Sequence, residues 1–196
     1  MNFKKILTVL FVYFLGFSNV QSLEPDVFVQ STVNKASSVL SKNISKEEKM
    51  TELKSIAKET VDIRGVGLYS LGSTRKKLDD NTKKIYLKLF EAYFLKSFSS
   101  RLSEYTNPEI EVKGKKVLNK NYTIVNSILI STPERPEVRI DWRIYTKDPD
   151  NPLIRDLIIE GLSLARTQKE EFSSILNSNN NDINALFKTL KEFSEE

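Results

Sequence analysis

Apolar residues recur at intervals of three and four behind Pro25, and this spacing predicts a helix. Its apolar face consists of Val29, Val33, Ala36 and Leu40, and a proline suits the first helical turn. A second helix is predicted from Ser45, which caps the helix in a capping-box pattern with Glu48. Its face continues through Met50, Leu53, Ala57 and Thr60, and residues 61–72 follow with glycines that allow tight packing or helix ends.

The widest apolar stripe predicts a long helix. It begins near Asp79, Asp80 or Asn81, any of which can cap it, and Asn107-Pro108 ends it after Tyr105. The stripe is much wider than a coiled-coil seam and consists of Ile85, Leu89, Phe90, Tyr93, Phe94, Phe98, Leu102 and Tyr105. This helix must therefore be covered on a broad front.

From residue 110 the period of apolar positions changes to two, which predicts strands over 110–117 and 122–130. A third strand is predicted where apolar residues alternate cleanly with Arg139, Asp141, Arg143 and Tyr145; these apolar residues are Val138, Ile140, Trp142 and Ile144. Residues 147–152 form a turn, and the next antiparallel strand is expected over 153–164.

That last segment is apolar except for Arg155, Asp156, the pair Glu160-Gly161, and Ser163. An acidic residue in such a run needs a partner or an exposed face, because burying it unpaired costs several kcal/mol. Glycine beside it usually marks a bulge or a close backbone approach. We therefore expect Glu160-Gly161 to be a structural device at a strand end.

Two more helices are predicted, around Phe172 and from Ile183 to Leu190, with a loop at 177–181. Helices, a meander of about four strands, and helices again define an α+β domain, in which an antiparallel sheet is covered by helices. The order of the strands stays open. The apolar layer is generous enough to enclose an apolar pocket between sheet and helices, although a plain core is the alternative.

Residues 1–22 have the organisation of a signal peptide. Lys4 and Lys5 precede an apolar stretch over 6–17, and Val20-Gln21-Ser22 offers a cleavage site before Leu23. A short membrane anchor is the alternative, but the stretch is too short to span comfortably. The predicted organisation is a signal peptide, 1–22, and one domain, 23–196, long enough for a real core.

Composition narrows the function. Without Lys4 and Lys5 the formal charge falls from +4 to +2, so the domain is not a polycation that would coat nucleic acid. The chain contains no cysteine, hence no disulfide framework. It contains no histidine, which excludes Ser-His-Asp and Cys-His catalysis and argues against a zinc site. We expect no metal and no cofactor.

Carboxylate chemistry is a weak alternative. Asp156 and Glu160 lie about 13 Å apart along a strand, farther apart than the carboxylate pairs of glycosidases. Asp141 alternates with Arg139 and Arg143, which favours a solvated, charge-paired face. We do not expect an enzyme; one acting on envelope lipids or glycans is the third choice.

The basic cluster Arg75-Lys76-Lys77 has two interpretations. Charge runs of this kind are usually solvated, here at a helix entry. The alternative is a contact patch for acidic partner surfaces or lipid phosphates.

Three parts of the chain together resemble the MlaC family, also called the toluene-tolerance family. They are Val61-Asp62-Ile63 running to Leu71-Gly72, the phenylalanine-rich helix ending in Tyr105, and the run Asp156-Leu157-Ile158-Ile159-Glu160-Gly161-Leu162-Ser163. The family's later helix carries a phenylalanine, which Phe172 matches. The chain departs from the family pattern at Arg75 and at Gln168-Lys169, which affects local contacts or partner surfaces rather than the fold.

The resemblance implies a periplasmic phospholipid carrier of Gram-negative bacteria, which maintains outer-membrane lipid asymmetry as a monomer. Its implied partners are an inner-membrane transporter with an MCE-domain subunit and an outer-membrane lipoprotein complex. The tail-pocket residues are predicted from the face of the helix or strand on which each lies and from its position in the family motifs. They are Val66, Leu68, Leu71, Phe90, Phe94, Phe98, Ile128, Trp142, Ile144, Leu162 and Phe172. An exported adaptor that binds another protein and no lipid is the alternative.

Overall fold

The structure, a computed structural model, describes residues 23–195, so the predicted signal peptide lies outside the described residues. Helices α1 (Pro25–Ser41) and α2 (Lys46–Thr60) come first, as predicted. The predicted capping box is present: Ser45 Oγ accepts a hydrogen bond from Glu48 N at 3.2 Å, and the Glu48 carboxylate accepts one from Ser45 N at 2.9 Å.

The glycine-bearing stretch forms helix α3 (Ile63–Ser70), followed by the short 3-10 helix η1 (Thr74–Lys76) and the long helix α4 (Asp80–Leu102). Asp79 caps α4, because its carboxylate accepts hydrogen bonds from Asn81 N at 2.9 Å and Thr82 N at 3.0 Å. Helix α4 ends before the expected Tyr105, since the chain tightens into turns there and Asn107 adopts a left-handed φ of 46°.

Strands β1 (Ile110–Asn119), β2 (Tyr122–Leu129), β3 (Val138–Tyr145), β4 (Leu153–Ile159) and β5 (Leu162–Ser163) form one antiparallel sheet in chain order. The alternation around Trp142 is confirmed, since Ile140, Trp142 and Ile144 are all buried. Between β3 and β4 the register shifts, so that Arg155 is an extra residue between the pairs Ile144–Ile154 and Arg143–Asp156.

The expected single strand over 153–164 is wrong beyond Ile159. Glu160 and Gly161 both have a positive φ, 49° and 84°, and this pair reverses the chain into a tight hairpin that pairs Ile159 with Leu162. Helix α5 (Leu164–Ser178) then starts directly from β5, and α6 (Ile183–Glu195) follows a turn in which Asn180 and Asn181 are left-handed.

Three apolar clusters form the core. The sheet cluster joins α1 to the inner face of the sheet and consists of Phe28, Val29, Val33, Val125, Leu129, Ile140, Trp142, Ile144 and Ile154. The helical cluster joins α3 to α6 and consists of Val66, Leu71, Tyr86, Phe90, Ala165, Phe172, Leu176, Leu186 and Leu190. The α1–α2 cluster consists of Val39, Leu40 and Leu53.

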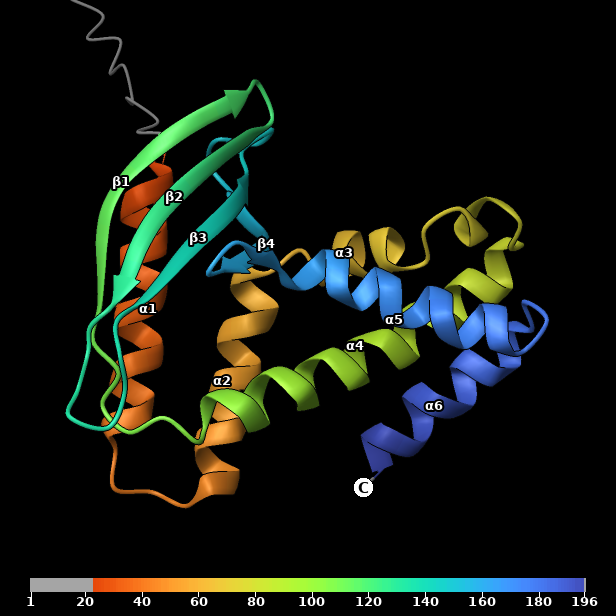
Figure 1. Cartoon of the computed structure of the whole chain (residues 1–196), viewed down its shortest axis with the longest axis horizontal. Coiled ribbons are helices and arrows are strands. Elements are labelled where there is room, and N and C mark those ends of the chain that lie inside the picture. Colours follow the sequence, from red (N-terminus) through yellow and green to blue (C-terminus); the bar gives the residue numbers. More distant parts are fainter. Residues whose placement is uncertain (1–22, 196) are drawn as a thin grey trace, which may run out of the picture.

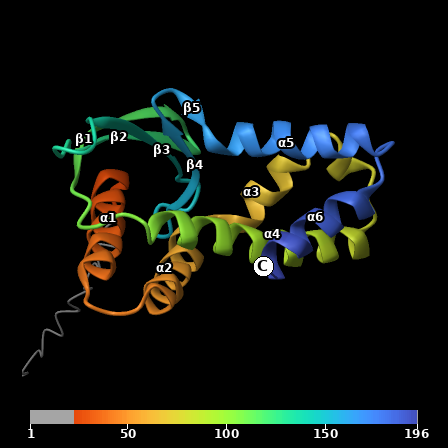
Figure 2. The same cartoon turned by 60° about the horizontal axis from the view of Figure 1, so that its bottom comes forward.

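The elements are arranged as an open sheet with helices on one face and a helical group beside it. Figure 1 shows α1 running along the sheet, and Figure 2 shows α1 and α2 on the same side of it, while α3 to α6 gather beyond the β4 edge. This confirms the predicted α+β class. None of the helices within residues 23–195 combines the length and apolarity that crossing a membrane requires.

Candidate functional site

A row of aromatic side chains along α4 leads out of the helical cluster. Phe90, Phe94 and Phe98 lie at i, i+4 spacing, which places them on one helix face, with ring centroids 6.1 Å and 5.8 Å apart. Phe90 is buried, whereas Phe94 and Phe98 are half-buried. One turn further, Leu102 packs against the α1–α2 cluster. The row therefore bridges two clusters with an apolar surface that the fold covers only in part.

Helix α3 approaches this row very closely. Gly67 lies against Phe90, such that a Cβ at Gly67 would be 2.7 Å from the phenylalanine ring. The buried Tyr86 hydroxyl donates a hydrogen bond to Gly67 O at 2.9 Å. Phe172 of α5 completes the group with an edge-on contact to Phe90, their centroids 6.2 Å apart. Phe90, the first ring of the row, is thus held by α3 and by α5.

On the sheet, Trp142 is held by a hydrogen-bonded chain. Its Nε1 donates to Ser127 Oγ at 2.8 Å, and this hydroxyl donates to Ile140 O at 3.0 Å. Both polar side chains are buried and satisfied, so the indole keeps one orientation on the inner face of the sheet. Leu157 packs beside it as a half-buried neighbour.

The sheet and the helical group meet at the start of α3. Val61 packs against both the sheet cluster and the helical cluster, and it forms a parallel bridge with Ile154. Asp62 then accepts hydrogen bonds from Gly65 N at 2.7 Å and from Arg155 Nε at 2.5 Å. The Arg155 guanidinium also lies 4.5 Å from the Tyr145 ring centroid. The extra residue in β4 is therefore the one that ties the sheet to α3.

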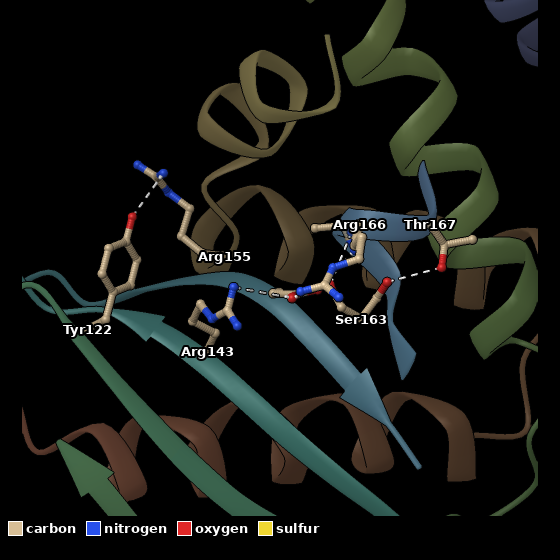
Figure 3. Close-up of polar contacts among 8 residues, drawn as sticks. Tyr122, Arg143, Arg155, Ser163, Arg166 and Thr167 are labelled. Carbon is tan, nitrogen blue, oxygen red and sulfur yellow. Dashed lines mark hydrogen bonds and ion pairs between the residues drawn. The ribbon is translucent and has the colours of Figure 1, made fainter. Parts of the chain in front are cut away.

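A second polar junction joins β4 to α5. The Asp156 side chain is almost fully buried and accepts hydrogen bonds from Ser163 Oγ at 2.6 Å and Ala165 N at 3.0 Å. Figure 3 shows Ser163 between Arg143 and Thr167; Ser163 Oγ accepts a bond from Arg166 N at 3.1 Å, and Ser163 O accepts one from Thr167 Oγ1. Asp156 thus accepts a hydrogen bond from a backbone N–H at the start of α5 that has no partner within the helix, and this structural role fits its burial.

Glu160 has a comparable task in the hairpin. Its N–H donates to Arg139 O at 3.0 Å, and its carboxylate accepts a hydrogen bond from Arg139 N. The prediction of a structural device at a strand end is confirmed. The two carboxylates of the run point to different neighbours and do not form one site.

The predicted tail-pocket residues fall mainly into two groups. The helical cluster contains Val66, Leu71, Phe90 and Phe172, with Phe94 packed against it, and the sheet cluster contains Trp142 and Ile144. Leu68 and Phe98 are half-buried and belong to neither set of buried residues. The structure does not bring the whole set into a single layer.

Two predicted residues lie apart from both groups. Ile128 pairs with Arg139 and lies on the sheet face opposite to Val125 and Leu129. Leu162 is 60% exposed at the β4–β5 turn. Their role in binding tails stays a prediction.

Arg75, Lys76 and Lys77 are exposed in and after η1, at the helical end of the molecule (Figure 1). None of the three is ion-paired with another residue that the structure describes. A hollow of about 690 Å³ runs along α5 beside Tyr69, and polar side chains such as Arg166, Lys169 and Ser173 line it. It is not the predicted apolar pocket, which stays a prediction.

Some residues that build the site carry no signal in the sequence. Tyr86 lies within the long apolar stripe, but only the fold shows its bond to Gly67 O. The pairing of Asp62 with Arg155 joins residues far apart in the chain. The one signal in the sequence is the glycine at position 65, which indicates a close approach. A Cβ at Gly65 would lie 2.5 Å from the Arg155 guanidinium carbon. Within residues 23–195, no group of three potential metal ligands comes together.

The fold and its bridging aromatic row define a small α+β domain with an open antiparallel sheet, an apolar inner face and an adjoining helical group. The sequence model of the family described as MlaC protein matches residues 30–192. The chain therefore belongs to the MlaC family. No curated protein matches the sequence.

Among solved structures, the chain is similar to a phospholipid-binding protein from Ralstonia solanacearum, determined in complex with a phospholipid at a resolution of 1.53 Å. The TM-score is 0.73 with 15% sequence identity, and the match covers 88% of this chain and 98% of that chain. At this identity the likeness shows a shared fold.

Proposed function

We propose that this protein binds a phospholipid and carries it through water, with the acyl chains against the aromatic row of α4. The half-buried Phe94 and Phe98 carry the proposal, because they continue the row from the buried Phe90 towards Leu102 and the fold covers them only in part. Membership of the MlaC family supports it, and so does the phospholipid held by the similar fold from Ralstonia solanacearum.

The proposed tail site lies between the aromatic row of α4 and the inner face of the sheet. On the helical side it includes Phe90, Phe94 and Phe98, and on the sheet side Trp142 and Ile144. Further proposed contacts in this site are Val66, Leu68, Leu71 and Phe172. The predicted contacts Ile128, on the opposite sheet face, and Leu162, exposed at the β4–β5 turn, lie outside it. Val61 and the Asp62–Arg155 pair hold the helical group to the sheet.

The energetics require such a site. Two acyl chains contain about 30 methylene groups, and each costs about 0.8 kcal/mol in water, so bare transfer faces roughly 24 kcal/mol. An apolar protein surface removes that cost, because the acyl chains then contact protein where they had contacted the bilayer interior, and they stay out of water. The phosphate stays at the mouth in contact with water, because burying it unpaired is prohibitive.

The experiment is organic extraction of the purified protein, residues 23–196, followed by mass spectrometry. We expect stoichiometric phospholipid in the wild type. Replacing Phe94 with glutamate should abolish co-purified lipid, because a charge in the tail site is incompatible with acyl chains. The matched control is Ile85→Glu, since Ile85 is 45% exposed on the same helix.

Both variants are checked for folding by circular dichroism. Wild-type lipid content in a folded Phe94→Glu protein contradicts the proposed site. Absence of lipid from several wild-type preparations contradicts carriage and favours an adaptor that binds only protein.

We further propose that the carrier works in the periplasm after export by residues 1–22. There it moves lipid between an outer-membrane lipoprotein complex and an inner-membrane transporter with an MCE-domain subunit. Family membership supports this route. Because a carrier must both load and unload, the free energy of the lipid in the protein has to be close to its free energy in the membrane. The direction of transfer is then set by the docked partners.

A further inference from the structure

The tip of the β1–β2 hairpin exposes apolar side chains beside lysines. Val117 is 68% exposed and Leu118 is 46% exposed, whereas most side chains of this size are covered. Lys116 precedes them and Lys120 follows, both exposed and neither ion-paired with another described residue. We call Lys116, Val117, Leu118 and Lys120 the hairpin tip.

The charge of this hairpin is one-sided. Residues 112–133 include four lysines and no carboxylate. Lys113 pairs with Glu111, and Lys115 pairs with Glu24 and Asp26. The positive charge left over is therefore that of Lys116 and Lys120, on either side of the two exposed apolar residues.

The start of α1 extends the apolar surface. The pairs that Lys115 makes with Glu24 and Asp26 hold the start of α1 beside the hairpin, where Leu23 is 39% exposed and Val27 is 56% exposed. Figure 1 shows the hairpin reaching past this end of α1. The neighbouring β3–β4 turn carries Asp148 and Asp150, so attraction to an anion must come from the hairpin tip itself.

The tip is also continuous with the interior. In the sheet register Val117 lies opposite Thr123, Thr123 opposite Ile144, and Ile144 opposite Ile154. This row passes from a largely exposed side chain to three buried ones. One end of it is at the surface, and the other belongs to the sheet cluster.

We propose that the hairpin tip docks on the surface of an anionic phospholipid bilayer, with Val117 and Leu118 at the headgroup level and the two lysines on lipid phosphates. Lysines attract anionic membrane surfaces, and small apolar groups add affinity when they enter the interface. A protein partner fits less well, because protein interfaces are depleted in lysine and their energetic centres are rich in Trp, Tyr and Arg. The tip carries none of those three.

The test is flotation of residues 23–196 with vesicles of phosphatidylcholine containing phosphatidylglycerol, against vesicles of phosphatidylcholine alone. We expect binding to the anionic vesicles that weakens as salt rises. The double variant Lys116→Gln/Lys120→Gln should bind roughly thirtyfold more weakly, and Val117→Ser/Leu118→Ser on the order of tenfold more weakly.

Matched controls come from elements other than the β1–β2 hairpin. Lys188→Gln/Lys191→Gln on α6 removes the same charge from exposed lysines, and Leu164→Ser removes an exposed leucine. Both should bind vesicles like the wild type. Equal binding by the tip variants and the controls overturns the proposal, as does equal binding of the wild type to neutral and anionic vesicles.

Lipid extraction from the same variants separates this proposal from the carrier function. Tip variants should keep their co-purified phospholipid while losing vesicle binding. A wild type that contains phospholipid but does not bind vesicles overturns the docking surface and leaves the carrier function standing. Tip variants that bind vesicles normally but lose a protein partner assign the tip to that partner instead.

Discussion

Asp156 and Glu160 are the residues of this chain that look most like reactive groups, and both are used to hold backbone. Asp156 satisfies Ser163 Oγ and the N–H of Ala165 at the start of α5, and Glu160 satisfies an N–H of Arg139. A buried carboxylate with two donors and an arginine 3.7 Å away is well paired. The positions of both carboxylates are explained by these hydrogen bonds and need no substrate.

Tyr86 is the residue for which burial has the clearest titration consequence. Loss of hydration raises the pKa of the Tyr86 hydroxyl above its ordinary value, and the hydroxyl donates to Gly67 O. In the unfolded chain the pKa of tyrosine is about 10. Above that pH the unfolded state releases a proton that the folded state retains, so stability falls as pH rises.

We therefore expect the free energy of unfolding to fall by up to about 1.4 kcal/mol per pH unit above pH 10 through this group. Tyr86→Phe should cost about 1 kcal/mol at pH 7, because Gly67 O loses its donor, and should flatten the alkaline slope. Urea unfolding from pH 7 to 11 measures both. Tyr69→Phe, at an exposed tyrosine, is the control, and an unchanged slope in Tyr86→Phe would refute the assignment.

At the scale of elements, the seating of α3 on α4 depends on a glycine. A Cβ at Gly67 would meet the Phe90 ring, and Phe90 is wedged against Phe172. The close approach of α3 to α4 therefore fixes the position of the Phe90 ring, which is the first ring of the aromatic row.

We expect Gly67→Ala to lower the free energy of unfolding by about 1–3 kcal/mol through overpacking, although alanine favours helix by itself. Gly114→Ala is the matched control, since a Cβ there has open space, and it should change stability by less than about 1 kcal/mol. Denaturant unfolding compares the two. Equal effects at both glycines would mean that Phe90 moves aside freely.

The whole molecule carries its two exposed basic surfaces on different parts of the fold. The hairpin tip belongs to the sheet, whereas Arg75, Lys76 and Lys77 lie in and after η1, on the far side of the helical group (Figure 1). The tail site proposed between them can therefore serve a membrane contact and a protein contact without the two surfaces overlapping.

If Arg75, Lys76 and Lys77 contact acidic partner surfaces, replacing all three with glutamine should slow association with the MCE-domain subunit or the outer-membrane complex several-fold. High salt should produce a similar loss in the wild type, because exposed charges act mainly on the association rate. Binding kinetics with each purified partner measure this. Lipid content should stay unchanged, and unchanged association with both partners would leave the cluster as a solvated helix entry.

The elements were largely predictable because local signals specify them. The capping box at Ser45, the cap at Asp79 and the alternation around Trp142 are all present as expected. The errors lie where the chain changes direction. The reversal at Glu160-Gly161 lies inside the single strand expected over 153–164, because the apolar pattern resumes directly after a turn of only two residues.

The helices and strands, the α+β class and the family likeness follow from the amino-acid sequence alone, since periodicity, caps and motif order are properties of neighbouring residues. Only the folded chain shows which apolar residues share a cluster and which carboxylates accept hydrogen bonds from the backbone. The same holds for the ion pair of Asp62 with Arg155 and for the cross-strand row that joins Val117 to Ile144. These pairings join distant segments, and strand register and helix crossing, which set them, arise only when the whole chain packs.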